Sequence, residues 1–309
     1  MRIAIVGAGG VGGYFGGRLA AAGADVAFLA RGAHLVALRE DGLRIESGLG
    51  DARVSVRAED DPAAIGPVDL VIVAVKLWDS ADAMRQIAPL VSPDTAVLSL
   101  QNGVVKDDVL RASFGADRTI GALCYISAII ARPGVIKHTG TSQRIVVGEF
   151  GGRTSTRVEA FADLCRRAAI DVAVSANIER AIWKKFVFLV GVSGATSVIR
   201  QPIGPIRANA RARTFLGSLF TETIAVGGAR GIEFAADFAD DRLAFCDTLS
   251  PAFSSSMHGD LERGNRLELP WLQGAVSQFG RDLAIATPAN DFVVDVLAVY
   301  ADGAPAILA

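Results

Sequence analysis

The chain has 309 residues, 51% of them hydrophobic and 21% charged, with a formal net charge of −2 at pH 7. This length allows two domains with substantial cores, and the balanced charge, with no basic block, argues against binding to nucleic acid. A strand is predicted from Arg2 onward, so we expect no secretory or transit segment before it, and no uninterrupted apolar run reaches membrane-spanning length. We therefore predict a cytoplasmic protein with no membrane partner.

Two residue types that often form metal or redox sites are scarce and scattered. The chain contains three cysteines and three histidines at widely separated positions: Cys124, Cys165, Cys246, His34, His138 and His258. The cysteines have no paired spacing, which predicts small buried residues in a reducing compartment. The histidines have no ligand spacing, so we predict no metal site.

The first motif in chain order is a strand that leads directly into a glycine turn. Residues 2–6 read RIAIV, and the six residues after them are Gly7, Ala8, Gly9, Gly10, Val11 and Gly12. The first glycine of this pattern permits a tight turn, the second lets the backbone approach a pyrophosphate, and the third lets helix and strand pack closely. A helix predicted over 14–22 and a strand over 25–29 complete a βαβ context, in which the helix N-terminus stabilises phosphate charge. These six residues are therefore predicted to bind a dinucleotide.

The end of the second strand favours NADP over NAD. An NAD site usually has an acidic residue about 20 positions after the glycines, where it hydrogen-bonds the ribose 2′-hydroxyl. Here the strand ends in Phe28-Leu29-Ala30-Arg31-Gly32, with a cation and no acid. An arginine can bind a 2′-phosphate through two charge-assisted hydrogen bonds. We therefore predict NADP (NADPH) as the cofactor, with Arg31 at its 2′-phosphate.

Strand and helix signals continue to alternate through the first half of the chain. The predicted order is a helix over 33–40, a hairpin of 43–46 and 53–56, a strand over 69–75, a helix over 80–87, a strand over 96–100, extended runs over 119–130 and 135–149, a helix over 155–168 and a strand over 170–174. The run over 69–75 is almost entirely apolar, as in a strand buried on both faces of a parallel sheet. The alternation predicts a doubly wound α/β sheet of the Rossmann type.

From residue 177 the pattern becomes helical. One apolar helix is predicted over 178–198, helical segments follow, and Thr287 is predicted to cap a helix that begins at Pro288. We therefore expect an NADP-binding domain over 1–176 and a helical substrate and catalytic domain over 177–309. Several apolar residues of the helical half are predicted to form its core, with a homodimer surface as the alternative: Phe215, Leu216, Leu219, Phe220, Phe292, Val293, Val296 and Leu297.

Polar residues follow two of the predicted central strands. Lys76 comes after the strand over 69–75, and Asn102 follows the strand over 96–100. In open α/β sheets ligands bind outside the carboxyl ends of the strands, so both residues are predicted to line the site; solvated loop residues are the alternative. The helical half adds further candidate residues: Trp183-Lys184-Lys185, the run over 254–257, and Glu268.

In this order and spacing the motifs resemble those of the ketopantoate reductases (2-dehydropantoate 2-reductases), over nearly the whole chain. The matching motifs are the glycine turn with Arg31, Lys76, Leu100-Gln101-Asn102-Gly103, His138-Thr139-Gly140, Trp183-Lys184-Lys185, the segment SMHGDLERG over 256–264 with Glu268, and Thr287-Pro288-Ala289-Asn290. The resemblance implies a Rossmann domain joined to an all-α domain of the 6-phosphogluconate-dehydrogenase-like type, with the substrate between them. It also implies NADPH-dependent reduction of a 2-keto acid, first of all ketopantoate to pantoate in pantothenate biosynthesis.

The resemblance also implies roles for individual residues. Lys185, two residues after the tryptophan, would be the catalytic lysine, because an ammonium group stabilises the negative charge that develops on the carbonyl oxygen and supplies the proton. Glu268 would act with it by hydrogen-bonding the substrate or product hydroxyl, and Ser256 would anchor the substrate. Asn102 would contact both substrate and cofactor, and would line the nicotinamide side together with Lys76.

Three positions depart from the family pattern. Members with established ketopantoate chemistry carry asparagines four and eight residues after the lysine and again further downstream, whereas this chain has Leu189, Ser193 and Ile203. Because steps of four residues stay on one helical face, Leu189 and Ser193 are predicted to flank Lys185, with Ser193 as a substrate contact. Each lost amide hydrogen bond costs about 1–3 kcal/mol if it leaves a buried partner unsatisfied. Two alternatives therefore stay open: a related hydroxy-acid dehydrogenase with a bulkier, less polar substrate, and a non-catalytic NADPH-binding sensor.

Overall fold

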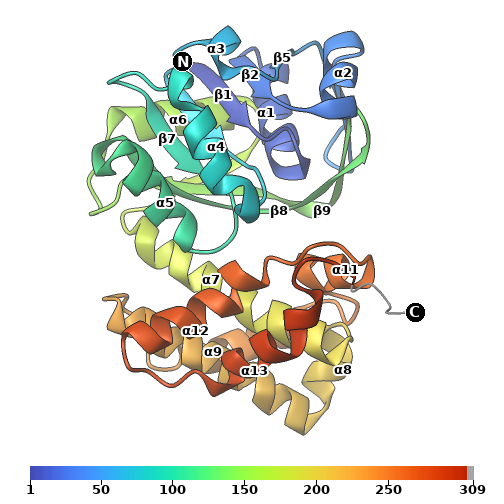
Figure 1. Ribbon diagram of the computed structural model, residues 1–309, viewed down its shortest axis with the longest axis vertical. Helices are drawn as coiled ribbons and strands as arrows, with labels where there is room; N and C mark the ends of the chain where they lie inside the picture. Colours follow the sequence, from blue (N-terminus) through green and yellow to red (C-terminus); the bar gives the residue numbers. More distant parts are fainter. Residues whose placement is uncertain (305–309) are drawn as a thin grey trace. The chain divides into compact units, whose positions relative to one another are not determined.

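The computed structural model describes residues 1–304 and divides into two compact units. The N-terminal unit comprises Met1–Ala181 and the C-terminal unit comprises Ile182–Ala309 (Figure 1). The division falls inside one helix, α7 (Ile178–Ile199), slightly later than the predicted boundary between residues 176 and 177. The first turn of α7 belongs to the N-terminal unit because Ile178 is buried directly over Gly121 and Gly148.

The N-terminal unit contains the predicted alternation of strands and helices. Its elements are β1 (Arg2–Val6), α1 (Gly10–Ala21), β2 (Asp25–Leu29), α2 (Gly32–Glu40), β3 (Leu43–Ser47), β4 (Ala52–Val54), β5 (Arg57–Glu59), α3 (Pro62–Ile65), β6 (Leu70–Val73), η1 (Leu77–Asp79), α4 (Ser80–Gln86), η2 (Ala88–Leu90), β7 (Ala96–Ser99), α5 (Val105–Phe114), η3 (Ala116–Arg118), β8 (Thr119–Arg132), β9 (Val135–Gly148), α6 (Thr156–Arg167) and β10 (Asp171–Val174). The short β5 and α3, and the helix α5, have no counterpart in the sequence prediction.

The sheet is parallel at its centre and mixed beyond it. Its strand order is β4-β3-β9-β8-β7-β6-β1-β2-β5, and β10 pairs with β9. The strands from β5 to β8 pair in parallel, as predicted for a doubly wound sheet. The long strands β8 and β9 then pair antiparallel, as do β3 and β4, while β3 and β10 both run parallel to β9. The N-terminal unit is thus a Rossmann-type sheet extended by a long hairpin.

Strand β6 shows why the centre of this sheet is apolar. Leu70 and Ile72 pack into the core on the α1 side, whereas Val71 and Val73 pack into the core on the side of α4 and α5. Successive side chains of a strand point to opposite faces, so a strand covered on both faces needs an unbroken apolar run. The prediction of a strand buried on both faces is therefore confirmed.

The sheet curves around α1. This helix contacts β2, β3, β4, β8 and β9, and it can approach them closely because it is rich in glycine. A Cβ atom added at Gly16 would press on Phe28, and one added at Gly17 would press on Leu43. The close packing fixes the start of α1 relative to the ends of the central strands.

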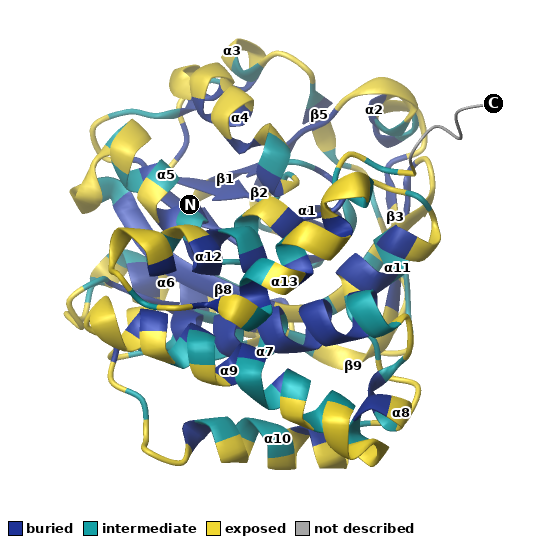
Figure 2. Cartoon of the chain, turned by 60° about the horizontal axis from the view of Figure 1, so that its bottom comes forward, coloured by how far each residue is buried: buried dark blue, intermediate teal, exposed yellow. Residues whose placement is uncertain are grey.

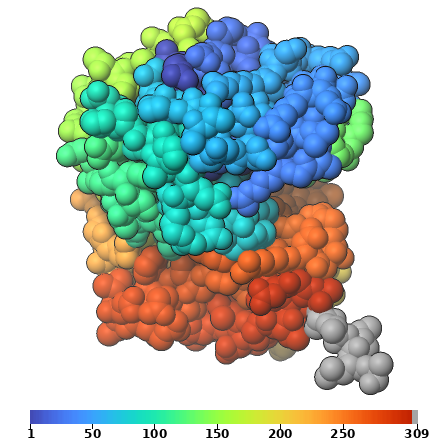
Figure 3. Space-filling model, turned by 45° about the horizontal axis from the view of Figure 1, so that its top comes forward, coloured from blue at the N-terminus to red at the C-terminus, as the bar shows by residue number. Residues whose placement is uncertain are grey.

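The C-terminal unit is helical, as predicted. After α7 it contains α8 (Ile203–Ala208), α9 (Ala210–Ala229), α10 (Phe238–Thr248), α11 (Ser256–Glu262), η4 (Leu269–Trp271), α12 (Gln273–Asp282), α13 (Pro288–Leu297) and η5 (Ala298–Tyr300). Helix α7 lies at its centre, because a Cβ atom at Gly191 would overlap Phe220 of α9, and one at Gly194 would meet Gln273 of α12 and Val293 of α13. Figure 2 accordingly shows most of α7 as buried and α10 as largely exposed, and Figure 3 shows α12 and α13 at the surface of this unit.

Lys184 and Lys185 interrupt the apolar sequence of α7, in accord with the prediction of no uninterrupted apolar run of membrane-spanning length. With 22 residues, α7 is long and apolar enough to cross a membrane by length and composition. However, 67% of its most apolar window is buried inside the protein. A helix that is apolar on all sides is expected at the centre of a bundle, so the core position accounts for its composition.

Helix α13 begins at Pro288, as predicted, but its cap differs from the prediction. Within residues 1–304, the Thr287 side chain makes no hydrogen bond to the backbone of the first turn. The carboxylate of Glu222 on α9 accepts these hydrogen bonds instead, at 2.8 Å from Ala289 N and 3.0 Å from Asn290 N. A carboxylate at a helix N-terminus also complements the helix dipole, so α9 fixes the start of α13.

Candidate active site

The predicted residues of the N-terminal unit follow strands that end in one row. In the parallel register, Leu29 of β2, Val6 of β1, Val73 of β6 and Ser99 of β7 lie side by side. The backbone N–H after each of β1, β6 and β7 donates to the last carbonyl of a neighbouring strand at 2.8–3.2 Å. Ligands of open α/β sheets bind at this carboxyl edge, where the sheet brings together the turn over 7–12, Arg31, Lys76 and Asn102.

The glycines of the turn have different structural reasons: some are required by packing, and one is not. Gly7 has a φ of +99°, which favours glycine. A Cβ atom at Gly10 would overlap the carbonyl oxygen of Ala128, and one at Gly12 would overlap that of Gly7. At Gly9 an added Cβ atom would meet no atom of residues 1–304 within 4 Å, apart from its two chain neighbours. Packing therefore accounts for glycine at 10 and 12 but not at 9, the position predicted to approach a pyrophosphate.

The N-terminus of α1 has the properties of a phosphate site. Gly9 is its N-cap residue, and among the described residues no side chain caps the helix there. The first turn over 10–13 reads GVGG and contains no acidic residue. The N–H groups of a first helical turn have no partner within the helix and carry the positive end of its dipole. The turn and the helix end thus fit the phosphates of a dinucleotide.

Arg31 lies at the same edge, between β2 and α2. It is exposed and is the N-cap residue of α2, and its Nη2 atom donates to Oε1 of Gln86 at 2.7 Å. Gln86 is the last residue of α4, so this contact holds the guanidinium between the loops that follow β2 and α4. Contact with a 2′-phosphate stays a prediction for this position.

A residue without a predicted role, Gln101, joins the loops that carry Lys76 and Asn102. Its Nε2 atom donates to the carbonyl of Val75 at 2.9 Å and to the hydroxyl of Ser80 at 2.7 Å. Its Oε1 atom accepts a hydrogen bond of 2.9 Å from the hydroxyl of Ser99, at the end of β7. The Gln101 side chain is buried, which is unusual for glutamine and requires such partners. The signal in the sequence was its place directly before Asn102.

In the C-terminal unit, α7 carries the predicted catalytic lysine. Lys185 is half-buried in the second turn of this helix. Trp183, two residues earlier, is buried and packs edge-on against Phe186, with 5.5 Å between ring centroids. Lys184 points elsewhere, with its Nζ atom 5.4 Å from the ring centroid of Phe238 on α10. Adjacent residues of an α-helix point about 100° apart, so the two lysines face different sides of α7.

The start of α11 is tied to α7. Ser255, the N-cap residue of α11, accepts a hydrogen bond from the backbone N–H of His258 at 3.1 Å. The same hydroxyl lies 3.0 Å from Oγ1 of Thr196 on α7. Ser256 is the exposed first residue of α11, so the helix with the predicted anchor is joined to the helix that carries Lys185.

Glu268 lies in the connection between α11 and α12. The residue is buried, and its backbone carbonyl accepts hydrogen bonds from Trp271 N at 3.0 Å and from Leu272 N at 3.1 Å. These bonds form the turn η4 and fix the backbone at Glu268. Its predicted hydrogen bond to the substrate hydroxyl stays a prediction.

The structure places Ser193 and Ile203 inside the C-terminal unit. Ser193 is fully buried, and its hydroxyl lies 2.9 Å from Nε2 of Gln273 and 3.2 Å from the carbonyl of Val190. Each step of four residues turns an α-helix about 40° away from the starting face, so Ser193 lies about 80° around from Lys185. The structure thus gives no support for a substrate contact of Ser193. Ile203 is likewise fully buried, whereas Leu189 is half-buried.

Each of the three histidines takes part in local structure, and Nδ1 of His258 contacts the hydroxyl of Ser254. His138 lies between Ser47 Oγ at 2.9 Å and the Ser142 carbonyl at 3.0 Å, and His34 Nδ1 accepts the Gly134 N–H at 3.1 Å. Burial lowers the pKa of His34 below its ordinary value, although a hydrogen bond with the backbone of Ala8 opposes the shift. Among residues 1–304 no three or more His, Cys, Asp or Glu side chains form a group that could hold a metal ion.

The three cysteines are buried, as predicted, and within residues 1–304 none of them forms a disulfide. Burial raises the pKa of Cys165 to about 12 and that of Cys246 to about 11. A thiol with so high a pKa is protonated near neutral pH and is a poor nucleophile or metal ligand.

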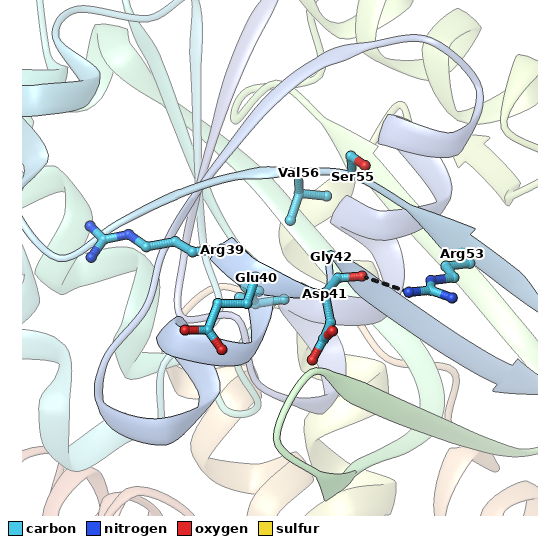
Figure 4. Close-up of a pocket in the computed structure, with 8 residues that line it drawn as sticks. Arg39, Glu40, Asp41, Gly42, Arg53, Ser55 and Val56 are labelled. Carbon is cyan, nitrogen blue, oxygen red and sulfur yellow. Dashed lines mark hydrogen bonds between the residues drawn. The ribbon is translucent and has the colours of Figure 1, made fainter.

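A pocket in the N-terminal unit lies apart from these residues. It is formed by the end of α2, the turn into β3, and the strand β4 with the residues after it (Figure 4). Its lining is Leu38, Arg39, Glu40, Asp41, Gly42, Arg53, Ser55 and Val56. Two arginines and two acidic residues leave it without a dominant charge, and Arg53 already donates to the carbonyl of Asp41. None of the predicted site residues lines this pocket.

Comparison with known proteins covers both units. Residues 3–152 match the family model described as "Ketopantoate reductase PanE/ApbA", and residues 177–301 match its C-terminal model. The chain is 32% identical to the uncharacterized oxidoreductase YkpB of Bacillus subtilis, over 97% of this chain and 99% of that protein. It is 30% identical to a 2-dehydropantoate 2-reductase of Mesorhizobium japonicum, over 95% of this chain and 96% of the relative. A crystal structure of 2-dehydropantoate 2-reductase from Geobacter metallireducens matches with a TM-score of 0.89 and 34% identity, over 96% of this chain and 99% of that one.

These matches extend through the glycine turn, the helix of Lys185 and the segment up to Glu268. The Rossmann-type unit, the helical unit and the phosphate-binding turn agree with them, and together they support an oxidoreductase that uses a nucleotide cofactor. The chain belongs to the ketopantoate reductase family.

Proposed function

We propose that this protein reduces a 2-keto acid to a 2-hydroxy acid with NADPH. Two features of this member of the ketopantoate reductase family together carry the proposal. Its glycine turn leaves space beside Gly9, and Lys185 follows a buried tryptophan by two residues. A sensor that only binds the nucleotide would need the first feature but not the second.

The residues at the carboxyl edge of the sheet would hold the cofactor. The backbone of residues 7–12 and the N-terminus of α1 would bind the pyrophosphate, and Arg31 would bind the 2′-phosphate. Lys76 and Asn102, whose loops are joined by Gln101, would line the nicotinamide side. When bound, NADPH supplies the hydride that is added to the carbonyl carbon.

The C-terminal unit would supply the groups that act on the carbonyl oxygen. As the carbon accepts hydride, negative charge develops on the oxygen, and the Lys185 ammonium stabilises this charge and donates a proton to it. The products are the 2-hydroxy acid and NADP⁺. Glu268 would hydrogen-bond the new hydroxyl, and Ser256, on the helix tied to α7, would anchor the substrate.

Two substrate classes are compatible with this chemistry. Ketopantoate, reduced to pantoate in pantothenate biosynthesis, is the first substrate to test because of the family. A bulkier, less polar 2-keto acid is the second candidate, favoured by Leu189 on α7 and by the buried position of Ser193. We expect the reaction to take place in the cytoplasm, in accord with three cysteines that form no disulfide in the part of the chain that the structure describes.

The test is to follow NADPH absorbance with purified protein and a panel of 2-keto acids that includes ketopantoate. Turnover of ketopantoate supports pantoate formation, and turnover of another 2-keto acid alone supports the second candidate. NADPH binding without turnover of any member would contradict the proposed function and favour a sensor.

A further inference from the structure

Three phenylalanine rings form a cluster on the C-terminal unit, which we call the ring cluster: Phe188 of α7, Phe245 of α10 and Phe253 in the segment before α11. The centroid of Phe188 lies 5.3 Å from that of Phe245, at a steep interplanar angle of 68°, and 6.3 Å from that of Phe253. Phe245 is 40% exposed and Phe253 is 36% exposed. Large aromatic side chains at this exposure leave apolar surface that packing within this unit does not use.

The backbone around the ring cluster is well anchored. The carbonyl of Phe253 accepts a hydrogen bond of 2.9 Å from Ile203 N at the start of α8, and Phe253 N donates to the Ser250 carbonyl at 2.8 Å. On α10, the guanidinium of Arg242 lies 5.2 Å from the ring centroid of Phe245, a cation–π contact that holds this ring. The exposed rings therefore belong to a fixed surface.

Two members of the ring cluster come from chain segments next to the residues predicted to act in catalysis. Around α7, Phe188 lies between Lys184 and Lys185, four residues after the first and three after the second, and Leu189 follows Lys185 by four residues; side chains at these spacings are neighbours on a helix surface. Phe253 precedes Ser256 by three residues, in the segment that the Thr196–Ser255 contact joins to α7. Both chain segments that carry the predicted catalytic and anchoring groups thus continue into aromatic side chains.

We infer that the ring cluster, together with Leu189, receives the side chain of the substrate, and that the preferred substrate is a 2-keto acid with an aromatic or large branched apolar side chain. This inference rests on the proposed function. Apolar groups gain free energy when they leave water for such a surface. The terminal hydroxyl of ketopantoate would lose hydrogen bonds to water there, and the rings offer it no replacement.

The experiment compares kcat/KM for phenylpyruvate, 4-methyl-2-oxopentanoate, ketopantoate and pyruvate with NADPH as the reductant. We expect phenylpyruvate to exceed both pyruvate and ketopantoate by at least tenfold. Phe253→Ala and Phe245→Ala should each lower kcat/KM for phenylpyruvate about tenfold and change the value for pyruvate less than threefold. Phe292→Ala is the matched control, because Phe292 is also exposed and pairs with another ring, Phe215, at 6.0 Å on other helices.

Failure of the inference can be distinguished from failure of the proposed function. If no 2-keto acid is reduced, the proposed function fails, and the inference fails with it. Suppose that kcat/KM for ketopantoate or pyruvate equals that for phenylpyruvate, and that the Phe245 and Phe253 variants lower kcat/KM for all substrates equally. The proposed reductase function is then supported, and the inference about the ring cluster is overturned. The inference is also overturned if Phe253→Ala changes the particle mass in light scattering but not the ratio of kcat/KM values, because the ring cluster would then be a protein interface.

Discussion

The side-chain amide of Gln101 lies 2.7 Å from the hydroxyl of Ser80. This contact crosses from the loop after β7 to the first turn of α4, which follows the loop after β6. A second hydrogen bond, to the Val75 carbonyl, reaches the residue before Lys76. One buried side chain therefore fixes the spacing of the two loops that carry Lys76 and Asn102.

Replacing Gln101 with leucine should weaken both the fold and cofactor use. The change leaves the Val75 carbonyl and two serine hydroxyls without this partner, which should lower the free energy of unfolding by about 1–3 kcal/mol. Because the two loops lose their link, we expect KM for NADPH to rise and kcat to fall. Urea unfolding and steady-state kinetics measure the two effects. Gln143→Leu is the control, because the Gln143 amide also donates to a carbonyl, that of Ala169, but lies away from the carboxyl edge of the central strands. Equal kinetic effects of the two variants would contradict the role of Gln101 in positioning the two loops.

The glycine turn allows a test that separates folding from binding. Gly10→Ala should destabilise the protein by about 1–3 kcal/mol, because its Cβ atom would overlap the backbone of Ala128. Gly9→Ala should change the free energy of unfolding by less than about 0.5 kcal/mol, since its Cβ atom would have open space around it among the described residues. If the pyrophosphate approaches Gly9, this second variant should still bind NADPH at least tenfold more weakly in a fluorescence titration. Unchanged affinity of a folded Gly9→Ala protein would contradict the predicted phosphate site.

Much of the fold follows from local patterns. The apolar run of β6, the glycine turn and the long apolar helix α7 each carry a signal within a short stretch of sequence, and the structure contains all three. Pairings between distant strands are harder to predict. The partners of β9 include β3, about 90 residues earlier in the chain, and β10, which follows α6. The mixed part of the sheet depends on these long-range pairings, which residue alternation alone does not specify.

The candidate site shows the same limit at the level of single residues. The positions of Lys76 and Asn102 after β6 and β7 could be predicted because strand ends are recognisable in sequence. The burial of Ser193 could not, because it depends on Gln273, which lies 80 residues further along the chain. Likewise, the cap of α13 comes from Glu222 and not from the adjacent Thr287. Side-chain hydrogen bonds between distant helices are decided by packing, which a helical pattern does not reveal.

Arg31→Glu should change the cofactor preference. If Arg31 binds the 2′-phosphate, its loss removes charge-assisted hydrogen bonds and the glutamate repels the phosphate, so NADPH affinity should fall about 10- to 100-fold. NADH, which has no 2′-phosphate, should be affected less than threefold. Fluorescence titration with both nucleotides measures this difference. Arg39→Gln is the control: it removes a cation near the other end of α2, where Arg39 pairs with Glu59 and Asp60, and should leave the cofactor preference unchanged. If Arg31→Glu lowered the affinities for NADPH and NADH equally, the assignment of Arg31 to the 2′-phosphate would be contradicted.

The two adjacent lysines of α7 form a matched pair for testing the proton donor. Lys185→Ala should lower kcat about 100- to 10,000-fold, the range expected for loss of general acid catalysis, while NADPH affinity stays within about threefold. Lys184→Ala removes the cation above Phe238 and should change kcat only a few-fold. Single-turnover measurements with saturating NADPH would compare the chemical step directly. Similar rates for both variants would mean that Lys185 is not the proton donor.

Glu149, which directly follows β9, is expected to make the stability of the fold depend on pH. Its buried carboxylate accepts hydrogen bonds from Arg157 Nε at 2.7 Å, from Arg157 Nη2 at 2.8 Å and from Ser155 Oγ at 2.6 Å. Burial by itself raises the pKa of Glu149, but the hydrogen bonds and positive charge of Arg157 outweigh it and hold the pKa below its ordinary value. The ionised form of Glu149 is therefore stabilised more, relative to the protonated form, in the folded state than in the unfolded chain.

The sign of the pH dependence follows from this lowered pKa. Its contribution to stability is complete above the unfolded value near 4.5 and is lost as the pH falls through the lower folded value. Glu149→Gln should cost about 1–3 kcal/mol at pH 7, and the difference from the wild type should shrink as the pH is lowered below about 4.5 in urea unfolding. Asp163→Asn breaks an exposed ion pair with Arg166 and should cost less than about 1 kcal/mol at either pH. A constant difference between wild type and Glu149→Gln from pH 7 to pH 3 would show that Glu149 has the same pKa in both states, because only a shifted pKa makes the free energy of unfolding depend on pH.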